Sequence, residues 1–87
     1  MYVIIVYDIS VDRVSKVCNF LRRYLVRVQN SVFEGDLTDR QFADVEYGLK
    51  QIIEKKEDSV RFYVIRSQDL VKVSNMGVEK GEQCTII

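Results

Sequence analysis

The stretch YVIIVYD, residues 2–8, decides the fold, because every residue before its final aspartate is apolar or aromatic. It is rich in β-branched residues and too short for an independent helix, so it predicts a β-strand. A strand with one exposed face alternates apolar with polar residues, whereas this strand is apolar on both faces. We therefore expect protein to cover both sides of it, with the charge of Asp8 at its end.

Two segments outside this strand show the helical period. Residues 11–25 space apolar residues three or four apart, and Ser10 stands at the N-cap position. Thr38 and Gln41 fit a capping box, which predicts the start of a second helix. Gly48 lies in the middle of that helix, where it lowers helix propensity, and close packing against the sheet would explain it.

The remaining segments have strand character or weak patterning. Residues 26–37, VRVQNSVFEGDL, are interrupted by QNS and predict either two short strands or one bent strand. Residues 59–66 predict a further strand. The polar residues 67–83 show little periodicity, and CTII at 84–87 is a candidate for a short terminal strand.

The predicted order is strand, helix, one or two strands, helix, strand. It indicates an α+β protein with the ferredoxin-like βαββαβ arrangement, a two-layer sandwich with both helices on one sheet face. We expect one domain over residues 1–87, with a core at 1–66 and a C-terminal segment at 67–87 that carries the terminal strand. Because this layout leaves the other sheet face bare, we expect a homodimer, packed sheet against sheet.

Composition excludes several kinds of site. The chain has 13 basic and 13 acidic residues, so its net charge predicts no partner. It has no histidine, which excludes imidazole catalysis and histidine-bound zinc. Cys18 and Cys84 fit no CxxC or zinc-ligand spacing. We see no membrane-length apolar run and no signal peptide, so we expect a cytoplasmic protein without a membrane partner.

Asp8 has two interpretations. Its oxygens could accept hydrogen bonds from N–H groups at the start of the following helix. In a sheet-to-sheet dimer, however, two copies of Asp8 would come close together, and facing carboxylates repel unless a proton or cation lies between them. Mg²⁺ or Mn²⁺ prefers oxygen ligands and can activate water for phosphodiester cleavage. Asp8 is therefore the candidate catalytic and metal-ligating residue.

Basic residues gather in the first third of the chain. Arg13, Lys16 and Arg23 are spaced to share one face of the first helix. There they could contact a phosphate backbone without reading sequence. An ordinary solvated helix face explains the same charges, and charge alone favours that interpretation.

Parts of the chain also resemble a known family. The matching features, in order, are VYDIS at 6–10, Arg13 and Lys16, RVQNSVFEGDL at 27–37, and DSVRFYVI at 58–65. This pattern resembles the small CRISPR-associated endoribonuclease or endonuclease family, number two, the partner of the spacer-acquisition integrase. The resemblance implies a ferredoxin-like homodimer in which Asp8 of each protomer binds a shared divalent metal. It also implies that the C-terminal strand pairs with the partner's sheet.

The resemblance further implies nucleic-acid contacts at Tyr7, Asp8, Arg27 and Phe33, with Arg13 and Lys16 approximately matching the family's basic residues in the first helix. From the residues alone, the expectations differ. An arginine on a strand, Arg27, would point to solvent, and Phe33 would lie in the core or the dimer interface. Tyr7 would pack beside the dimer seam.

One departure from the family pattern stands before the RVQ segment. The family commonly has Tyr-Gly there, whereas this chain has Tyr24-Leu25. A glycine at that place would allow a turn with positive φ, which leucine disfavours.

Two functions of different class follow. The first is a metal-dependent endonuclease or endoribonuclease that hydrolyses RNA or DNA phosphodiester bonds at paired Asp8 residues. The second is architectural, a nucleic-acid-binding scaffold for the spacer integrase in CRISPR adaptation. We expect the scaffold to be the biological role and the nuclease activity to be weak or conditional. A toxin-like ribonuclease of the same fold that cleaves mRNA is the alternative.

Overall fold

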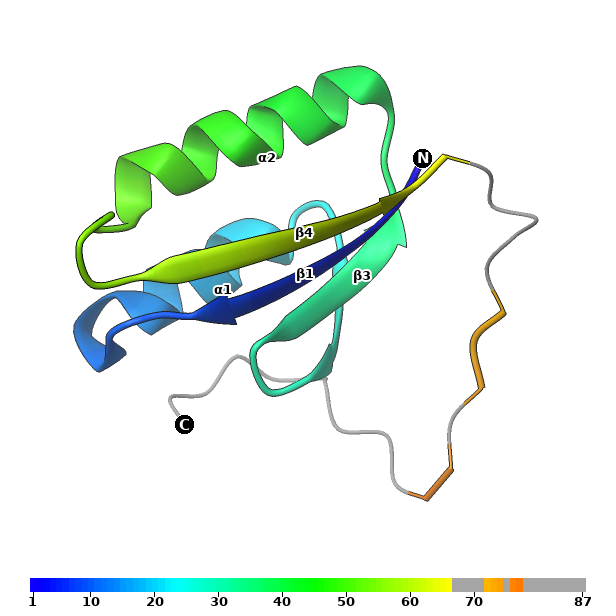
Figure 1. Ribbon diagram of the computed structural model, residues 1–87, viewed down its shortest axis with the longest axis horizontal. Helices are drawn as coiled ribbons and strands as arrows, with labels where there is room; N and C mark the ends of the chain where they lie inside the picture. Colours follow the sequence, from blue (N-terminus) through cyan, green and yellow to red (C-terminus); the bar gives the residue numbers. More distant parts are fainter. Residues whose placement is uncertain (67–71, 75, 78–87) are drawn as a thin grey trace.

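The computed structural model describes residues 1–66, 72–74 and 76–77, and the predicted terminal strand at 84–87 lies outside them. The described chain has the element order βαββαβ (Figure 1). The elements are β1 (Tyr2–Asp8), α1 (Val11–Leu21), β2 (Val26–Gln29), β3 (Val32–Asp36), α2 (Asp39–Ile52) and β4 (Ser59–Ile65). This order confirms the predicted α+β fold class. Neither described helix is long and apolar enough to cross a bilayer.

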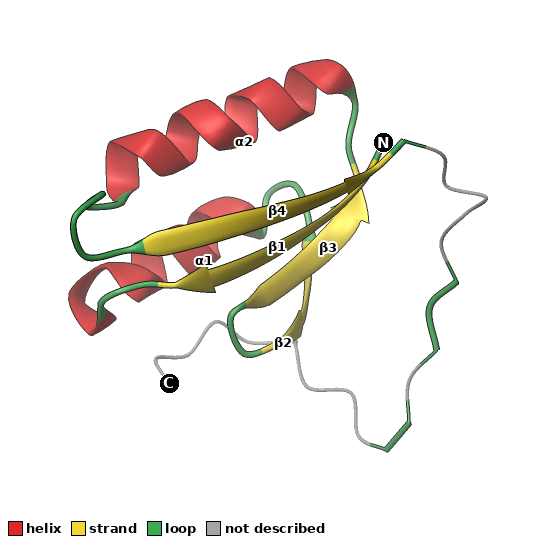
Figure 2. Ribbon diagram, in the orientation of Figure 1, coloured by secondary structure: helices red, strands yellow, loops and turns green. Residues whose placement is uncertain are grey.

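The strands form one four-stranded sheet in the order β2-β3-β1-β4. β1 is central and pairs antiparallel with both neighbours, so that Ile5 lies opposite Phe33 on one side and Phe62 on the other. Both helices lie on the same side of the sheet (Figure 2). The two-layer arrangement predicted from the sequence is therefore the one observed.

One face of β1 forms the centre of the core. Val3, Ile5 and Tyr7 face the helices and are 0%, 0% and 5% exposed. Full burial of an aliphatic side chain of this size stabilises a fold by about 1.5–3 kcal/mol. Residues from both helices and from β3 complete this core: Val17, Leu21, Phe33, Val45 and Leu49.

The segment that the sequence left open is a hairpin. β2 and β3 pair antiparallel, with a bulge between Arg27 and Gln29. Ser31 in the connecting turn has a φ of 67°, a left-handed conformation that polar residues adopt in tight turns. The Tyr7 N–H donates to the Ser31 carbonyl at 3.0 Å, which ties this turn to the end of β1. Two short strands are therefore the correct alternative.

The first helix is shorter than predicted. α1 ends at Leu21, and the N–H groups of Tyr24 and Leu25 turn back to the Leu21 carbonyl at 3.0 and 2.9 Å. Leu25 does not have a positive φ, which among described non-glycine residues occurs only at Ser31. Its side chain is buried in the core, and a Cβ at Gly35 would lie 3.0 Å from its Cδ2 atom. The glycine at position 35 therefore makes room for the leucine.

Ser10 occupies the N-cap position of α1, but its side chain does not cap the helix. The hydroxyl donates to the Asp12 carboxylate instead. That hydrogen bond is the main reason why the pKa of Asp12 is lowered. The Ser10 carbonyl accepts from the N–H groups of Arg13 and Val14 at 2.9 and 3.0 Å. The backbone carbonyl of Ser10 therefore starts the helix, while its hydroxyl is hydrogen-bonded to a nearby carboxylate.

The second helix begins as predicted, but its glycine has a different neighbour. The Thr38 hydroxyl accepts from the Gln41 N–H at 3.1 Å, and the Thr38 N–H donates to the Gln41 side chain at 3.0 Å. Gly48 faces α1 and not the sheet, since a Cβ there would lie 2.1 Å from Cζ of Phe20. The predicted close packing is therefore present, but between the two helices.

We predict that Gly48→Ala lowers the free energy of unfolding. Alanine gains about 1 kcal/mol of helix propensity over glycine, but its methyl group would collide with the Phe20 ring. Without the Phe20 ring, the effect of Gly48→Ala on the free energy of unfolding should change sign. Gly48→Ala should therefore stabilise a Phe20→Ala variant. Urea unfolding of the four proteins measures this interaction. A single Gly48→Ala variant more stable than the wild type would contradict the close approach of the helices.

Candidate functional site

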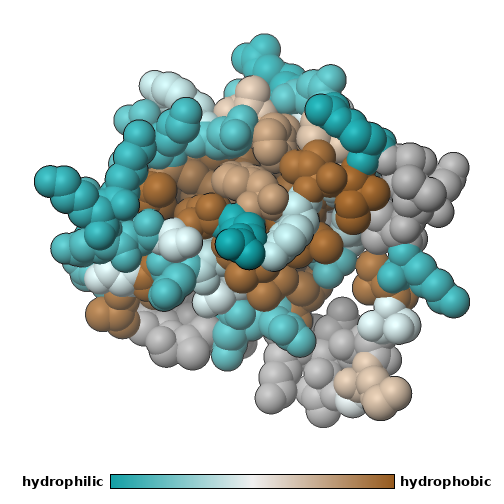
Figure 3. All heavy atoms as spheres, in the orientation of Figure 1, coloured by the Kyte–Doolittle hydropathy of each residue, from teal (hydrophilic) through white to brown (hydrophobic). Residues whose placement is uncertain are grey.

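No helix of the described chain covers the sheet face away from α1 and α2. On this open face, Ile4 of β1 pairs with Tyr63 of β4, and Val6 pairs with Arg61. Val6 is 37% exposed and Tyr63 is 47% exposed. Figure 3 shows apolar atoms gathered across the face turned to the viewer, with hydrophilic atoms around them. The described residues therefore leave the second apolar face that YVIIVYD predicts for β1 partly exposed.

Several polar groups of the open face are paired with one another. The Tyr2 hydroxyl donates to the Glu34 carboxylate of β3. Burial and this hydrogen bond raise the pKa of Tyr2 to about 12. Arg61 Nη1 lies 3.3 Å from the Tyr63 hydroxyl oxygen, to which it donates. Hydrogen bonds between these polar groups lower the cost of removing water from them.

Asp8 ends β1 on the open face. Its backbone pairs with Ser59 at the start of β4, and its side chain is exposed. Within the described residues no hydrogen bond or ion pair holds its carboxylate. The interpretation in which Asp8 caps the first helix is therefore wrong, because no N–H group of that helix donates to its carboxylate in the described chain. The carboxylate of Asp8 is available to a ligand.

Among the described residues, Asp8 offers a metal ion one carboxylate. An exposed carboxylate offers the oxygen donors that hydrated Mg²⁺ or Mn²⁺ prefers. The described part of one chain brings together no group of three His, Cys, Asp or Glu side chains that could hold an ion. One copy thus supplies a single ligand, and the donor set suits a metal where a second copy adds its own Asp8.

A buried carboxylate lies in the loop that leads to the partner strand of Asp8. We call Asp58, Arg13 and the backbone N–H groups of Ser10 and Glu54 the Asp58 clamp. Arg13 binds Asp58 through Nε at 2.7 Å and through Nη2 at 3.1 Å. Ser10 N–H and Glu54 N–H donate to the same carboxylate at 2.9 and 2.8 Å. The Asp58 side chain is 0% exposed, whereas Ser10 and Arg13 are partly exposed and Glu54 is exposed, so a buried carboxylate is held near the protein surface.

The clamp keeps Asp58 ionised. The hydrogen bonds from Arg13 hold the pKa of Asp58 well below its usual range, although its burial acts in the opposite direction. The N–H groups of Glu54 and Ser10 lower the pKa further. The same contacts raise the pKa of Arg13. Both partners of this pair therefore carry their charge at neutral pH.

Arg13 already contacts three carboxylates. Besides Asp58, its guanidinium lies 2.7 Å from Glu57 and 3.5 Å from Asp12. Its side chain is 21% exposed, and its charge is balanced within the protein. The predicted phosphate contact by Arg13 stays a prediction, while the structure gives this residue a role in joining α1 to the loop before β4.

Lys16 and Arg23 differ from Arg13 in their surroundings. Both side chains are exposed, Lys16 on α1 and Arg23 just after its end. Neither makes an ion pair with any residue that the structure describes. Of the three predicted basic contacts, these two are therefore accessible to a phosphate.

The other predicted contact residues lie on the helix side of the sheet. Phe33 is 0% exposed, and its ring centroid lies 6.1 Å from that of Tyr7. Of the two positions expected for Phe33, the core or the dimer interface, the structure shows the core. Tyr7 does not lie on the open face with Asp8, because the two are adjacent on a strand and point to opposite sides. Burial raises the pKa of Tyr7, against a smaller opposing effect of Arg27.

Arg27 does not point to solvent, contrary to the expectation from its strand position. It pairs with Phe33 across β2 and β3 and is 7% exposed. Its Nη2 donates to the Asn30 side-chain oxygen at 2.5 Å, and its Nε has no partner among the described residues. The register of the hairpin explains the burial, since it places Arg27 on the same sheet face as Phe33. Nucleic-acid contacts by Tyr7, Arg27 and Phe33 stay predictions.

Sequence reasoning missed Asp58. The residue stands directly before the predicted strand at 59–66, and its partner Arg13 lies 45 positions earlier in the chain. The sequence contains only a weak indication that Asp58 has a structural role. The predicted fold brings the end of the first strand beside the start of the last, so a carboxylate at position 58 comes near the first helix. Only the structure shows which cation it meets.

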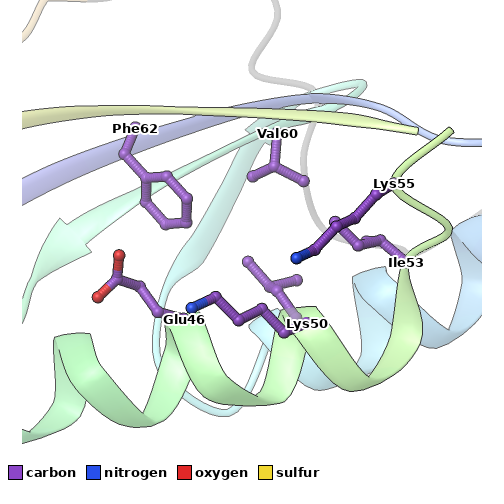
Figure 4. A pocket seen from close by; sticks show the side chains of 7 residues that line it. Glu46, Lys50, Ile53, Lys55, Val60 and Phe62 are labelled. Carbon is purple, nitrogen blue, oxygen red and sulfur yellow. The ribbon is translucent and has the colours of Figure 1, made fainter. Parts of the chain in front are cut away.

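A cavity of about 180 Å³ lies between α2 and β4 (Figure 4). Val60 and Phe62 line it from the side of β4, and Glu46 and Lys50 line it from the side of α2. It belongs to the helix side of the sheet and does not include Asp8, so we place the candidate site at Asp8 and not in this cavity. The lining residues are Glu46, Leu49, Lys50, Ile53, Lys55, Val60 and Phe62.

Comparison with known proteins decides the family. The family model described as CRISPR associated protein Cas2 matches residues 1–73. The chain belongs to the Cas2 family. This match contains all six described elements, and thus both Asp8 and the Asp58 clamp lie within Cas2 sequence. The resemblance read from the sequence is confirmed.

Relatives in the Cas2 family share about half of their residues with this chain. The CRISPR-associated endoribonuclease Cas2 2 of Archaeoglobus fulgidus is 51% identical over 81 residues, which cover 93% of this chain and 88% of the relative. The CRISPR-associated endoribonuclease Cas2 of Thermotoga maritima is 48% identical over 82 residues, which cover 94% of each chain. The similarity therefore extends over nearly the whole of both sequences.

Solved Cas2 structures have the same fold. A crystal structure of Cas2 matches this chain with a TM-score of 0.81 at 40% identity, covering 100% of this chain and 98% of that one. Streptococcus pyogenes Cas2 at pH 6.5 matches with a TM-score of 0.75 at 36% identity, covering 88% and 100%. The α+β architecture described above is therefore the Cas2 fold.

We predict that Asp58 stabilises the fold at neutral pH and that acid removes this contribution. The pKa of Asp58 is lowered in the folded protein from an ordinary value near 4. The folded state therefore binds fewer protons than the unfolded state, and stability falls as the pH drops from about 5 through the folded pKa. Asp58→Asn should flatten this acid loss, as measured by urea unfolding at several pH values.

Asp44→Asn is the matched control, because Asp44 makes only an exposed ion pair with Arg40 at 3.4 Å. Such a pair contributes little to stability. This control should keep the pH dependence of the wild type. Equal slopes for Asp58→Asn and the wild type would show that the clamp is not a pH-dependent source of stability.

Proposed function

We propose that this member of the Cas2 family acts in CRISPR adaptation as a homodimer that binds nucleic acid and hydrolyses phosphodiester bonds at paired Asp8 residues. One observation carries the proposal. Asp8, whose carboxylate is bonded by no described residue, ends the central strand on the sheet face that the helices leave open. The relatives named CRISPR-associated endoribonucleases support phosphodiester hydrolysis.

The proposed dimer follows from the open face. A second copy packed there would bury the apolar side chains that β1 exposes, with a gain of about 25 cal/mol for each Å² of apolar surface. A two-fold interface presents the same residues from both sides, so contact between the two β1 strands would bring Asp8 near its counterpart. The outer edge of β4 pairs with no other described strand. Residues 84–87 of one copy would add a strand at that edge of the partner.

The proposed reaction depends on two carboxylates. Asp8 from each copy would hold a shared Mg²⁺ or Mn²⁺, and both are oxygen ligands of the kind these ions take. The bound ion would supply positive charge to polarise the phosphate and to activate a water molecule. The chain contributes no imidazole, so Asp8 is the residue to which we assign the catalytic role. Apolar neighbours on the open face, such as Val6, would exclude bulk water around the pair.

The proposed nucleic-acid surface uses accessible charge. Lys16 and Arg23 are exposed and without ion pairs in the described chain. Positive side chains of this kind bind phosphates without reading the base sequence. The other three residues of the resemblance are buried: Tyr7, Arg27 and Phe33. Burial favours a role in which these side chains support the strand that carries Asp8.

The same dimer would serve as a scaffold for the spacer integrase. A sheet-to-sheet pair of βαββαβ units is a rigid body with one helix layer on each outer side. It could hold an integrase and a DNA duplex even with weak nuclease activity. We propose this scaffold as the biological role, with Asp8 dispensable for assembly. The family match favours a CRISPR protein over the toxin-like ribonuclease of the same fold.

We predict that Asp8→Asn removes metal-dependent cleavage and spares assembly. Loss of the charged ligand should lower the cleavage rate at least about 100-fold, since metal stabilisation of this kind is worth several kcal/mol. Labelled RNA and duplex DNA, incubated with and without Mg²⁺ or Mn²⁺, provide the measurement. The dimer and its complex with the integrase should persist. Cleavage by Asp8→Asn at the wild-type rate would exclude the assigned catalytic residue.

We predict that the double variant Lys16→Gln, Arg23→Gln weakens nucleic-acid binding uniformly across sequences. Each lost phosphate contact should reduce the slope of log K against log salt by roughly 1. Binding titrations at several salt concentrations measure both effects. Arg40→Gln on α2 is the control, since Arg40 is exposed but paired with Asp44. If the double variant keeps the wild-type affinity and salt slope, the nucleic acid binds elsewhere.

A further inference from the structure

We propose that Asp58 is a positioning residue for cleavage at Asp8. The inference rests on the proposed function. It assigns to the Asp58 clamp the task of holding the end of β1, and with it the Asp8 carboxylate, in one place.

The carboxylate of Asp58 is fully used within the clamp. Its Oδ1 accepts from the Ser10 N–H at 2.9 Å and from Arg13 Nη2 at 3.1 Å. Its Oδ2 accepts from Arg13 Nε at 2.7 Å and from the Glu54 N–H at 2.8 Å. An ionised carboxylate has about four acceptor sites. One buried side chain therefore joins three parts of the chain: the β1–α1 loop, α1 itself and the α2–β4 loop.

The clamp holds two segments beside Asp8, the chain that follows it and the start of the strand that pairs with it. Ser10 follows Asp8 by two residues, so its bond to Asp58 fixes the chain just beyond the site. Asp58 directly precedes Ser59, the cross-strand partner of Asp8. Both segments that border the Asp8 backbone thus meet at the same carboxylate.

Asp8 needs this external support. No described residue bonds its carboxylate, so its position depends on the backbone that carries it. Displacement of a reacting group by about 1 Å can lower a rate about 100-fold. A group that acts through another in this way should affect turnover more than substrate binding.

Asp58→Asn is the informative substitution. Asparagine keeps one acceptor oxygen but replaces the other with an NH₂ group. The NH₂ group cannot accept hydrogen bonds from the N–H donors of the clamp. The two bonds to that atom would therefore be lost. Thr38→Ala is the matched control. It removes the capping bond at the opposite end of α2, whose 14 residues span about 21 Å. Melting temperatures of both variants measure how far each substitution destabilises the fold, so that the activities are compared below both transitions.

The experiment compares kcat and KM for labelled RNA in Mn²⁺, together with hydrogen exchange of the peptide that spans residues 7–10. We expect Asp58→Asn to lower kcat about 10- to 100-fold with little change in KM. We also expect it to speed exchange in that peptide. Thr38→Ala should change neither quantity. Arg13→Lys, which keeps the charge but loses the two-pronged bond, should act like Asp58→Asn and replaces it if that variant does not fold.

Each outcome decides between the proposals. Wild-type kcat in Asp58→Asn, while Asp8→Asn is inactive, would overturn the positioning role and leave the proposed function intact. Unchanged exchange at residues 7–10 would overturn it as well, whatever the activity. A wild-type protein that does not cleave at all would refute the proposed nuclease, and hydrogen exchange alone would then show whether the clamp holds Asp8.

Discussion

The whole structure depends on one strand with two apolar faces. β1 lies at the centre of the sheet, where Val3 and Ile5 are fully buried under the helices. The alternate residues of the same strand face away from the helices, and Val6 remains 37% exposed. Burial of one face stabilises the single chain, whereas the other face gains its stabilisation only when something covers it. The difference in burial between the two faces of β1 is the reason why we propose that two copies assemble.

The same strand explains why a lone carboxylate can become a site. The end of β1 is held by β4, where Asp8 pairs with Ser59, and by the bond from the Tyr7 N–H to the Ser31 carbonyl, so it is better fixed than a loop would be. Asp8 stands at that end, and no described residue bonds its carboxylate, while the Asp58 clamp joins the segments around it. The chain thus separates two tasks that acidic residues can perform. The buried carboxylate organises the backbone, and the exposed one is left for a ligand.

Local patterns predicted most of the fold but little of the side-chain pairing. The capping box at Thr38 and the strand at 2–8 depend on neighbours in sequence, and both predictions were correct. Contacts across the fold were harder to predict. The burial of Arg27 follows from the register of a hairpin, and the partner of Gly48 is a ring from the other helix. The Asp58 clamp joins residues 45 positions apart, which no local pattern reveals.

Sedimentation equilibrium of the wild type and of Val6→Glu tests the central claim most directly. Val6→Glu places a charge on the open face, whereas Val11→Glu places one on α1, at a position that is 61% exposed. The account predicts a wild type with twice the mass of one chain, a monomeric Val6→Glu protein and a dimeric Val11→Glu protein. A wild type that stays monomeric at high concentration, or a Val6→Glu protein that dimerises as tightly as the wild type, would contradict it.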